Sequence, residues 1–467
     1  MHPTTENPAA APVRLSRWRL GAYATLQLPL AMSALPIVVT VSYFYGKHIF
    51  AGVPGILTIL AVIFFVTRLI DAIQDPLIGF VSDRLTHFHN GRMMMAVASV
   101  PFLGMGFYAI FAPPGLDHHA MLLYLFVALL VVHLGYSGVS INYHSLGAEL
   151  SYDYNERTRV TIWREVFGIV GLLLGAGLPP FLETHFGAAD GYHRVAVIFL
   201  PLLLIPTCAF WLLSPRPITP PLPKKPFSIF QVFVVPFRNK RFRSLLLVYL
   251  INGTSVGIAV TVVLFFIEGV LEVEGNFKFT FIGLYFLSGI VSVVFWLWLS
   301  RRTSKSAAWA MGIAFSCIGI TAAAFVGPGD IVAFAIICVF AGFGLGADYG
   351  LPPAILADVI HNEVSESQGE SGKYFGLWAM ATKLTAAIGG SAALILLDGF
   401  SLLIYGHAYD STVESGPMAL ILVYACLPAI VKFIALTLIW RVRIESAKPS
   451  VRRQWRLYRR PVVRAKR

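Results

Sequence analysis

The chain has 467 residues, of which 57% are hydrophobic and only 13% are charged, and its mean hydropathy is +0.72. A soluble domain cannot bury this much apolar surface, so the composition excludes an ordinary soluble protein and indicates that many side chains face lipid. The formal net charge of +12 would suit nucleic-acid binding in a soluble protein, but its distribution along the chain favours a membrane protein.

Apolar stretches long enough to cross a bilayer recur along the chain. A spanning helix needs roughly 20 mostly apolar residues, and about twelve stretches meet this requirement. We predict helices near residues 20–45, 55–81, 93–111, 121–147, 161–182, 195–213, 244–270, 281–300, 308–326, 331–357, 375–397 and 417–440. The first stretch is too long for a signal-peptide core and lacks a small-residue cleavage site, so we interpret it as a span.

The positive charges alternate between successive loops. One set of loops is rich in Arg and Lys, whereas the loops between them carry only Lys47, Arg194 and Lys278. By the positive-inside rule the rich set is cytoplasmic, which predicts an even number of spans with both termini inside. We therefore expect an integral protein of the cell (inner) membrane. The rich set contains Arg14, Arg17, Arg19, Arg84, Arg92, Arg157, Arg159, Arg216, Lys224, Lys225, Arg238, Lys240, Arg241, Arg243, Arg301, Arg302 and Lys305.

The longest internal polar connection divides the spans into six and six. We expect an N-terminal six-helix half at 1–213, a cytoplasmic linker at 214–243, a C-terminal six-helix half at 244–440 and a basic cytoplasmic tail at 441–467. The tail fits attraction to anionic lipid head groups better than nucleic-acid binding. The predicted class is an all-α membrane protein with the major facilitator fold, in which the solute site lies between the two halves.

The second predicted span has the densest group of charges within an apolar segment. Asp71 and Asp75 are four residues apart and share a helix face, and Arg68 lies one turn from Asp71. Two carboxylates in a low dielectric cannot both stay charged without a positive partner, so they either share a proton or hold a cation. The alternative is a structural Arg68–Asp71 salt bridge, with Asp75 facing a wet cavity.

Further oxygen ligands for a cation lie close in the sequence. Pro76 has no N–H and pushes against the carbonyl of Ala72, which would free that carbonyl to bind an ion. A hard cation such as Na⁺ prefers several oxygen ligands. We expect these to come from Asp71, Asp75 and the Ala72 carbonyl, with Gln74 or Thr67.

This segment resembles the second-span signature of the glycoside-pentoside-hexuronide cation symporters, the melibiose permease group of the major facilitator superfamily. The similar residues are Arg68, Asp71, Ala72, Asp75, Pro76 and Gly79, then Asp83-Arg84 and Gly91-Arg92, and further along Gly147-Ala148-Glu149, Glu156-Arg157-Thr158, Arg164, Asp358 and Gly372 to Lys383. The resemblance implies that Asp71 and Asp75 form the site of the coupling cation, Na⁺ or H⁺. Animal lysophospholipid transporters share the second-span pattern, so the resemblance does not by itself imply a sugar.

The sequence departs from the melibiose permeases where those proteins hold sugar hydroxyls with acids on the first and fourth spans. Here the first span has no acid and the fourth reads Ser-Ile-Asn-Tyr-His-Ser at 140–145, so galactoside recognition is not carried over. The side chains left for a central cavity are Gln27, Asn142, Tyr143, His144 and Trp378, with the cations Arg164, Lys383 and Lys432.

Several of these residues have two interpretations. Lys383 is expected to face the second-span carboxylates, either competing with the cation or forming a static ion pair. His144 is either a binding residue or a packed histidine, and Lys432 could simply snorkel. Asp348 lies among glycines and before Pro352-Pro353, which predicts a broken or kinked helix and either a substrate contact or a helix-break partner.

Charged residues at the predicted cytoplasmic helix ends are interpreted as gating residues. Asp83 and Arg84 with Arg92 resemble the loop motif of the superfamily, in which charged pairs hold helix ends in one orientation. Arg164 is expected nearer the cytoplasmic end, where it could pair across the halves with Glu149 or Asp358.

These observations predict cation-coupled symport of a sugar-like or anionic small solute by alternating access. The alternatives are a lysolipid-type amphiphile as solute, or a sensor that binds without transporting. A primary pump is disfavoured because no complete phosphate-binding loop is present, and an enzyme is disfavoured because no catalytic motif is present. We expect no cofactor besides the coupling ion, no nucleic-acid partner, and a monomer in the bilayer.

Overall fold

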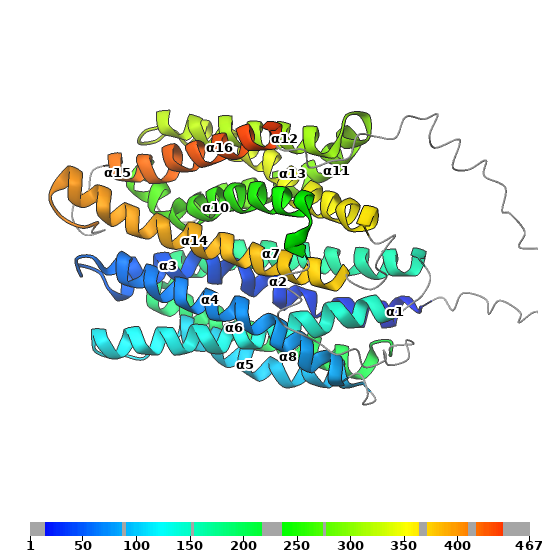
Figure 1. Ribbon diagram of the computed structural model, residues 1–467. Helices are drawn as coiled ribbons and strands as arrows, with labels where there is room; N and C mark the ends of the chain where they lie inside the picture. Colours follow the sequence, from blue (N-terminus) through cyan, green and yellow to red (C-terminus); the bar gives the residue numbers. More distant parts are fainter. Residues whose placement is uncertain are drawn as a thin grey trace, which may run out of the picture.

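The computed structural model describes residues 15–85, 90–150, 154–216, 236–273, 277–363, 371–409 and 417–441. Within these residues, twelve helices are long and apolar enough to cross a membrane, as predicted. They run roughly side by side along one axis (Figure 1). We call the end of the bundle where α1 begins and α16 ends the terminal end, and the opposite end the far end.

The twelve spans follow each other with short connections. The first span comprises α1 (Arg17–Ala24), α2 (Gln27–Leu35), η1 (Pro36–Thr40), α3 (Val41–Phe44) and η2 (Tyr45–Ile49). The next five are α4 (Ile56–Leu85), α5 (Gly91–Phe111), α6 (His118–Glu149), α7 (Tyr154–Phe186) and α8 (Ala188–Leu213). The second half contains α10 (Lys240–Gly269), α11 (Phe277–Arg302), α12 (Lys305–Ala322) with η3 (Ala323–Phe325), α13 (Ile331–Glu363), α14 (Ser371–Tyr405), and a last span made of α15 (Pro417–Ile421), η4 (Leu422–Cys426) and α16 (Leu427–Arg441).

Four predicted boundaries were wrong by six residues or more. Helix α7 begins at Tyr154 rather than near 161, and α13 ends at Glu363 rather than near 357. Helix α8 begins at Ala188 rather than near 195, and α14 continues to Tyr405 rather than ending near 397. These extensions carry polar side chains, such as Asp190 and Asp398, which lowered the hydropathy on which the prediction relied. Most of the predicted linker 214–243 and of the tail 441–467 lies outside the described residues.

The first span is not a single regular helix. Between α1 and α2 the chain turns at Thr25 and Leu26. Pro29 accounts for this interruption, because its ring pushes against the carbonyl four residues earlier, that of Thr25. Two π-helical segments, η1 and η2, follow before the span ends at Ile49. Such segments bend a helix locally.

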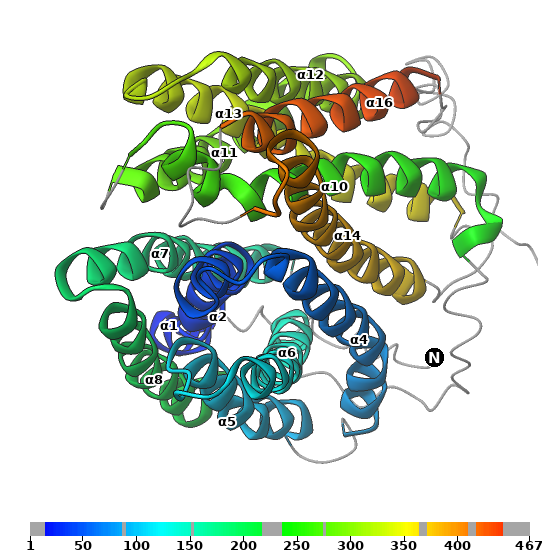
Figure 2. The same cartoon turned by 90° about the vertical axis from the view of Figure 1, so that its left-hand side faces the viewer.

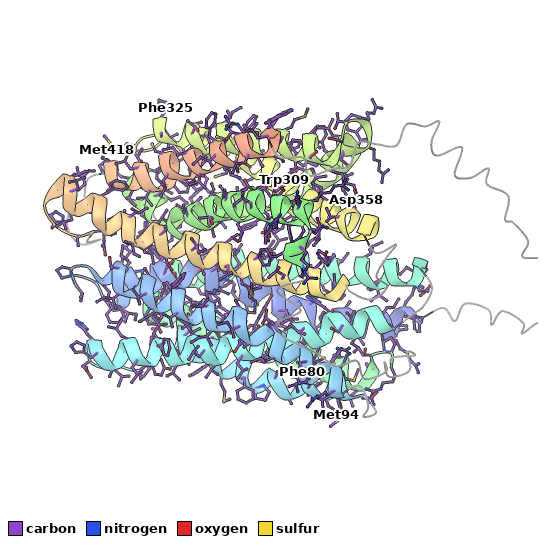
Figure 3. All side chains as sticks on the ribbon, in the orientation of Figure 1. Phe80, Met94, Trp309, Phe325, Asp358 and Met418 are labelled. Carbon is purple, nitrogen blue, oxygen red and sulfur yellow. The ribbon has the colours of Figure 1, made fainter. Side chains whose placement is uncertain are left out.

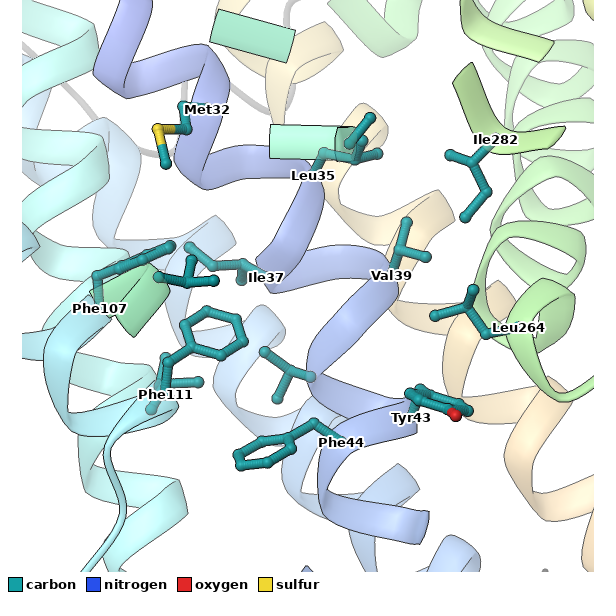
Figure 4. Packing of buried hydrophobic residues seen from close by; sticks show 14 of the residues in the cluster. Met32, Leu35, Ile37, Val39, Tyr43, Phe44, Phe107, Phe111, Leu264 and Ile282 are labelled. Carbon is teal, nitrogen blue, oxygen red and sulfur yellow. The ribbon is translucent and has the colours of Figure 1, made fainter. Parts of the chain in front are cut away.

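The helices form two groups that correspond to the two halves of the sequence. Seen from the far end, α1 to α8 gather in one group and α10 to α16 in the other (Figure 2). Helices α4 and α14 pack against each other across the boundary. The larger apolar core contains buried residues of both halves, and Figure 4 shows part of it around Phe44, Phe107 and Leu264. A second core contains residues of the C-terminal half alone.

Apolar side chains also cover the outside of the bundle (Figure 3). Phe325 is 84% exposed and Leu403 is 81% exposed. In water such exposure would be costly, whereas in a bilayer these side chains contact lipid.

Glycines allow several helices to approach closely. In lipid the hydrophobic effect does not favour helix–helix contact over helix–lipid contact, so helices associate there through close packing. At Gly171 on α7, a Cβ atom would lie 2.1 Å from the carbonyl oxygen of Leu28 on α2. At Gly342 on α13, a Cβ atom would lie 2.2 Å from the carbonyl oxygen of Tyr285 on α11. A larger side chain at either position would push the paired helices apart.

Candidate functional site

The second-span acids meet a lysine from the opposite half at the boundary between the halves. Lys383 on α14 lies with its Nζ 2.8 Å from Asp71 Oδ1 and 2.6 Å from Asp75 Oδ2, both on α4. The side chain of Asp71 is 3% exposed, that of Asp75 14% and that of Lys383 20%. The ion pairs therefore tie the two halves together at a site with little access to solvent.

A serine that the sequence did not single out completes this cluster. Ser137 on α6 donates to Asp71 Oδ1 at 3.0 Å and accepts from Lys383 Nζ at 2.9 Å. We call Asp71, Asp75, Ser137 and Lys383 the coupling centre. Small polar residues are common in membrane helices, so only the packing of α6 against α4 identifies Ser137.

The coupling centre offers oxygen ligands suited to a hard cation. One oxygen of Asp75, Oδ1, is buried and has no hydrogen-bond partner among the described residues. An orphaned buried carboxylate oxygen is costly unless something binds it. Together with an oxygen of Asp71 and the Ser137 hydroxyl, it provides the ligand type that Na⁺ would need.

Two other predicted ligands, Gln74 and Thr67, lie differently from the expectation. Gln74 donates its Nε2 to Asp71 Oδ1 at 3.0 Å, so its amide holds the carboxylate in place. The Thr67 hydroxyl donates to the carbonyls of Ile63 and Phe64 in its own helix. Ala72 is buried in α4, which continues without interruption through Pro76. Since Pro76 has no N–H to donate, the Ala72 carbonyl stays a predicted ligand.

Arg68 and a histidine border the coupling centre. Arg68 Nη1 lies 3.8 Å from Asp71 Oδ2, so the expected ion pair is present but long. With Arg68 and Lys383, the two acids form a group whose formal charges cancel. His133 on α6 is 4% exposed, and neither of its ring nitrogens has a hydrogen-bond partner in the described chain. It lines a pocket between the halves together with Arg68 and Thr67, and nothing in its sequence context marked it.

The polar residues predicted for the cavity in the N-terminal half divide into two groups. His144 is exposed, and its Nε2 lies 3.3 Å from Gln27 Oε1, so these two side chains form a polar pair between α6 and α2. Asn142, in contrast, is buried and donates to the carbonyl of Gly138. Tyr143 is buried too, and its ring stacks on that of Tyr23 at 4.6 Å. Asn142 and Tyr143 are therefore packing residues in this structure.

In the C-terminal half, Trp378 packs against Tyr249 with ring centroids 4.0 Å apart, and the Tyr249 hydroxyl lies 2.9 Å from Thr382 Oγ1. The helix is not broken near Asp348, because α13 runs from Ile331 to Glu363 through both prolines; the alternative, a kinked helix, stays a prediction. A helix inside a bundle tolerates prolines when neighbouring groups satisfy the freed backbone.

Lys432 does not snorkel to the membrane surface. It is 3% exposed and lies 3.3 Å from Asp348 Oδ2, inside the C-terminal half. The structure therefore overturns the interpretation of Lys432 as a lipid-facing side chain and gives Asp348 a partner.

The predicted gating residues form contacts within each half. Asp358 Oδ2 lies 2.6 Å from Lys305 Nζ, on α12 of its own half, rather than near Arg164. Arg164 Nη2 lies 2.7 Å from the carboxylate of Glu165, its neighbour in sequence.

The loop motif around α4 and α5 is described only in part. Arg92 donates to Ser82 Oγ at 2.7 Å, and the Arg84 guanidinium lies 4.2 Å from the centre of the Phe80 ring. The side chains of Asp83 and Glu149 lie outside the described residues, so their predicted contacts stay predictions.

A second group of charges joins the halves at the far end. Lys278 on α11 lies 2.9 Å from Glu268 on α10 and 3.3 Å from Glu183 on α7. Glu268 also pairs with Lys47 and accepts a hydrogen bond from Tyr43, both on the first span. Every hydrogen bond or ion pair between described residues of opposite halves either involves Lys383 or lies nearer the far end. The contacts of Lys278 and Glu268 join the two halves at the far end.

Comparisons with known proteins give a consistent result. The family profile described as "MFS/sugar transport protein" matches residues 22–446. The chain is 25% identical over 418 residues to the uncharacterized symporter YjmB of Bacillus subtilis, covering 83% of this chain and 84% of that protein. It is 23% identical to the sodium-dependent lysophosphatidylcholine symporter 1 of Gallus gallus, covering 72% and 71% of the two chains.

Solved transporters have the same fold. A crystal structure of the nucleoside transporter NupG, in its D323A form, superposes with a TM-score of 0.67 at 14% identity, covering 90% of this chain and 98% of that one. An inward-facing, unoccupied bacterial homologue of the lysosomal transporter Spinster also gives 0.67 at 14% identity, covering 93% and 100%. At this identity the likeness concerns the fold alone.

Proposed function

Because this chain belongs to the MFS/sugar transport protein family, and is thus a membrane transporter rather than an enzyme, we propose that it carries a solute together with a cation by alternating access. The observation that carries this proposal is the position of Lys383. Its ammonium, from the C-terminal half, contacts both carboxylates of the N-terminal half, those of Asp71 and Asp75. A cation and this ammonium compete for the same two carboxylates. Cation binding is therefore linked to a contact between the halves.

The charge balance gives the order of events. With Arg68 and Lys383 in place, the two acids are neutralised, and an added cation would leave a net positive charge in a low dielectric. Cation entry therefore accompanies release of Lys383 from Asp71 and Asp75. Release removes the ion pairs that hold α14 against α4, which frees the halves to rearrange.

The conformation described here fits one end of such a cycle. The far end is closed by the Glu268 and Lys278 contacts, and the positive-inside rule makes the terminal end cytoplasmic. The structure then corresponds to an inward-facing state in which Lys383 occupies the carboxylate pair.

We favour Na⁺ over H⁺ as the coupling ion. The oxygen atoms of Asp71, Asp75 and Ser137 suit a hard cation, and the relative from Gallus gallus is named as sodium-dependent. A sugar-like or anionic small solute is supported by the polar pair of Gln27 and His144. The same relative favours the alternative, a lysolipid-type amphiphile.

The test is uptake into proteoliposomes with Na⁺ and pH gradients imposed separately, using a panel of glycosides, hexuronides and lysophospholipids. We expect accumulation of one solute class to require the Na⁺ gradient. Asp75→Asn should abolish accumulation while leaving the protein monodisperse, because it removes the orphaned anionic oxygen. The control Asp190→Asn changes an exposed acid at the far end and should transport normally. Gradient-driven uptake by Asp75→Asn equal to that of the unmodified protein would contradict the proposal.

A further inference from the structure

A second buried ion pair lies inside the C-terminal half, apart from the coupling centre. Lys432 on α16 donates to Asp348 Oδ2 on α13 at 3.3 Å and to Asn252 Oδ1 on α10 at 3.0 Å. Trp309 on α12, labelled in Figure 3, donates its Nε1 to the other oxygen of Asp348 at 2.8 Å. The transport cycle described above does not use this group.

The Lys432 ammonium has binding capacity beyond these two contacts. An ammonium carries three N–H donors, and only Asp348 and Asn252 accept from it among the described residues. Its distance to Asp348 is longer than the roughly 2.7–2.9 Å of a strong charge-assisted hydrogen bond. Leaving a charged donor buried and unpaired is unfavourable. An additional hydrogen-bond acceptor at this position would therefore be stabilised.

Lys432 stands at one end of an apolar pocket and is the only charged side chain among the described residues that line it. On α10 the lining runs from Ser255 to Val263, about 12 Å of helix at 1.5 Å per residue. Tyr424 on η4, eight residues before Lys432 on the last span, also lines it. The pocket thus extends from Lys432 toward the far end.

The pocket lies partly at the boundary between the halves. Val39 on η1 contributes to its wall from the N-terminal half, opposite Ile282 on α11. These two side chains point toward one another in Figure 4. The pocket in this form therefore depends on closure of the far end.

We propose that this pocket binds a single-chain amphiphile with an anionic head group. The carboxylate or phosphate of the ligand accepts a hydrogen bond from the remaining N–H of Lys432. The alkyl chain of the ligand lies along α10 toward Tyr424. A fully polar solute would leave the apolar walls without contacts, and a neutral head group would gain less from the ammonium. The proposal rests on the inward-facing state described above, because the pocket in this form needs a closed far end, but it does not require that the bound amphiphile be transported.

The test uses dodecanoate with a photoreactive diazirine in its alkyl chain, bound to the full chain in nanodiscs of phosphatidylcholine. After irradiation, mass spectrometry locates the labelled residues. We expect labels on α10 and α11, and we expect unlabelled dodecanoate to displace the probe at concentrations about tenfold or more below those of dodecanol. Labels elsewhere only, or equal displacement by the two competitors, would overturn the proposal.

Variants separate the head-group contact from the apolar wall. The charge-balanced pair Lys432→Met with Asp348→Asn should keep labelling but lose the preference for dodecanoate. Ala259→Phe should lose labelling by filling the pocket, with the Lys432 group intact. Lys240→Met, at an exposed residue of the terminal end, serves as control and should behave like the unmodified protein. Retained preference in the double variant would mean that Lys432 does not bind the head group.

Discussion

Replacing Lys383 by Met should increase cation affinity while stopping net transport. The substitution keeps much of the side-chain volume but removes the ammonium that contacts Asp71 at 2.8 Å and Asp75 at 2.6 Å. Among the described residues, only Arg68, at 3.8 Å from Asp71, then balances the two acids. The empty site carries a net negative charge in the variant, and a bound cation restores neutrality.

The size of the effect follows from the contacts that a cation no longer has to displace. A hydrogen bond between charged groups contributes about 1.5–3 kcal/mol net. Lys383 makes two such contacts, but its side chain is 20% exposed and regains hydration on release. Counting one contact rather than two gives a cation affinity roughly tenfold to a hundredfold higher.

The assay is a Na⁺ titration of the purified protein followed by thermal unfolding, with choline replacing Na⁺ at constant ionic strength. A ligand that binds only the folded state raises the unfolding temperature of the protein as the ligand concentration increases. In the Lys383→Met variant, the Na⁺ concentration at which this increase is half complete should be lower than in the unmodified protein. In proteoliposomes the variant should exchange labelled for unlabelled solute but not accumulate it, since no ammonium replaces the ion on the return step. Lys240→Met is the matched control.

The reasoning would be refuted if Lys383→Met bound Na⁺ with unchanged or lower affinity. That result would mean that the lysine supports the ion site or serves as a static ion pair, and the competition between ammonium and cation would have to be abandoned. A parallel proton titration covers the case in which H⁺ is the coupling ion.

Two further predictions concern the far end and helix packing. Glu268→Gln weakens the far-end ion pairs, and a partly exposed pair contributes about 1 kcal/mol. In a cysteine-free background carrying Ser42→Cys, the substitution should therefore raise labelling of that cysteine by an impermeant thiol reagent several-fold. Unchanged labelling would show that the pairs do not hold the far end closed. Gly171→Ala places a methyl group against the Leu28 carbonyl and should lower stability by about 1–3 kcal/mol in thermal unfolding. At Gly177, also inside α7, no described atom lies within 4 Å of an added Cβ atom, so Gly177→Ala should not lower stability. Equal destabilisation by the two substitutions would argue against the close helix approach at Gly171.

The architecture could be predicted from the sequence because it follows from local composition. About 20 apolar residues must form a helix in lipid wherever they occur, since no water is present to satisfy the backbone. The twelve spans required no knowledge of neighbours, and the same reasoning identified Asp71 and Asp75 because charges in apolar segments are costly. Boundaries failed where helices extend past the apolar stretch, as in α8 and α14.

The partners of the charged residues depend on tertiary structure. Lys383 and Asp71 are 312 residues apart, and Lys432 and Asp348 lie on helices that no local pattern pairs. Ser137 and His133 carried no distinguishing signal, because a single polar residue in a membrane helix gains its role from the face that its neighbour presents. Periodicity places side chains around one helix axis, whereas a binding site needs the relative rotation and depth of several helices, and only their packing determines these.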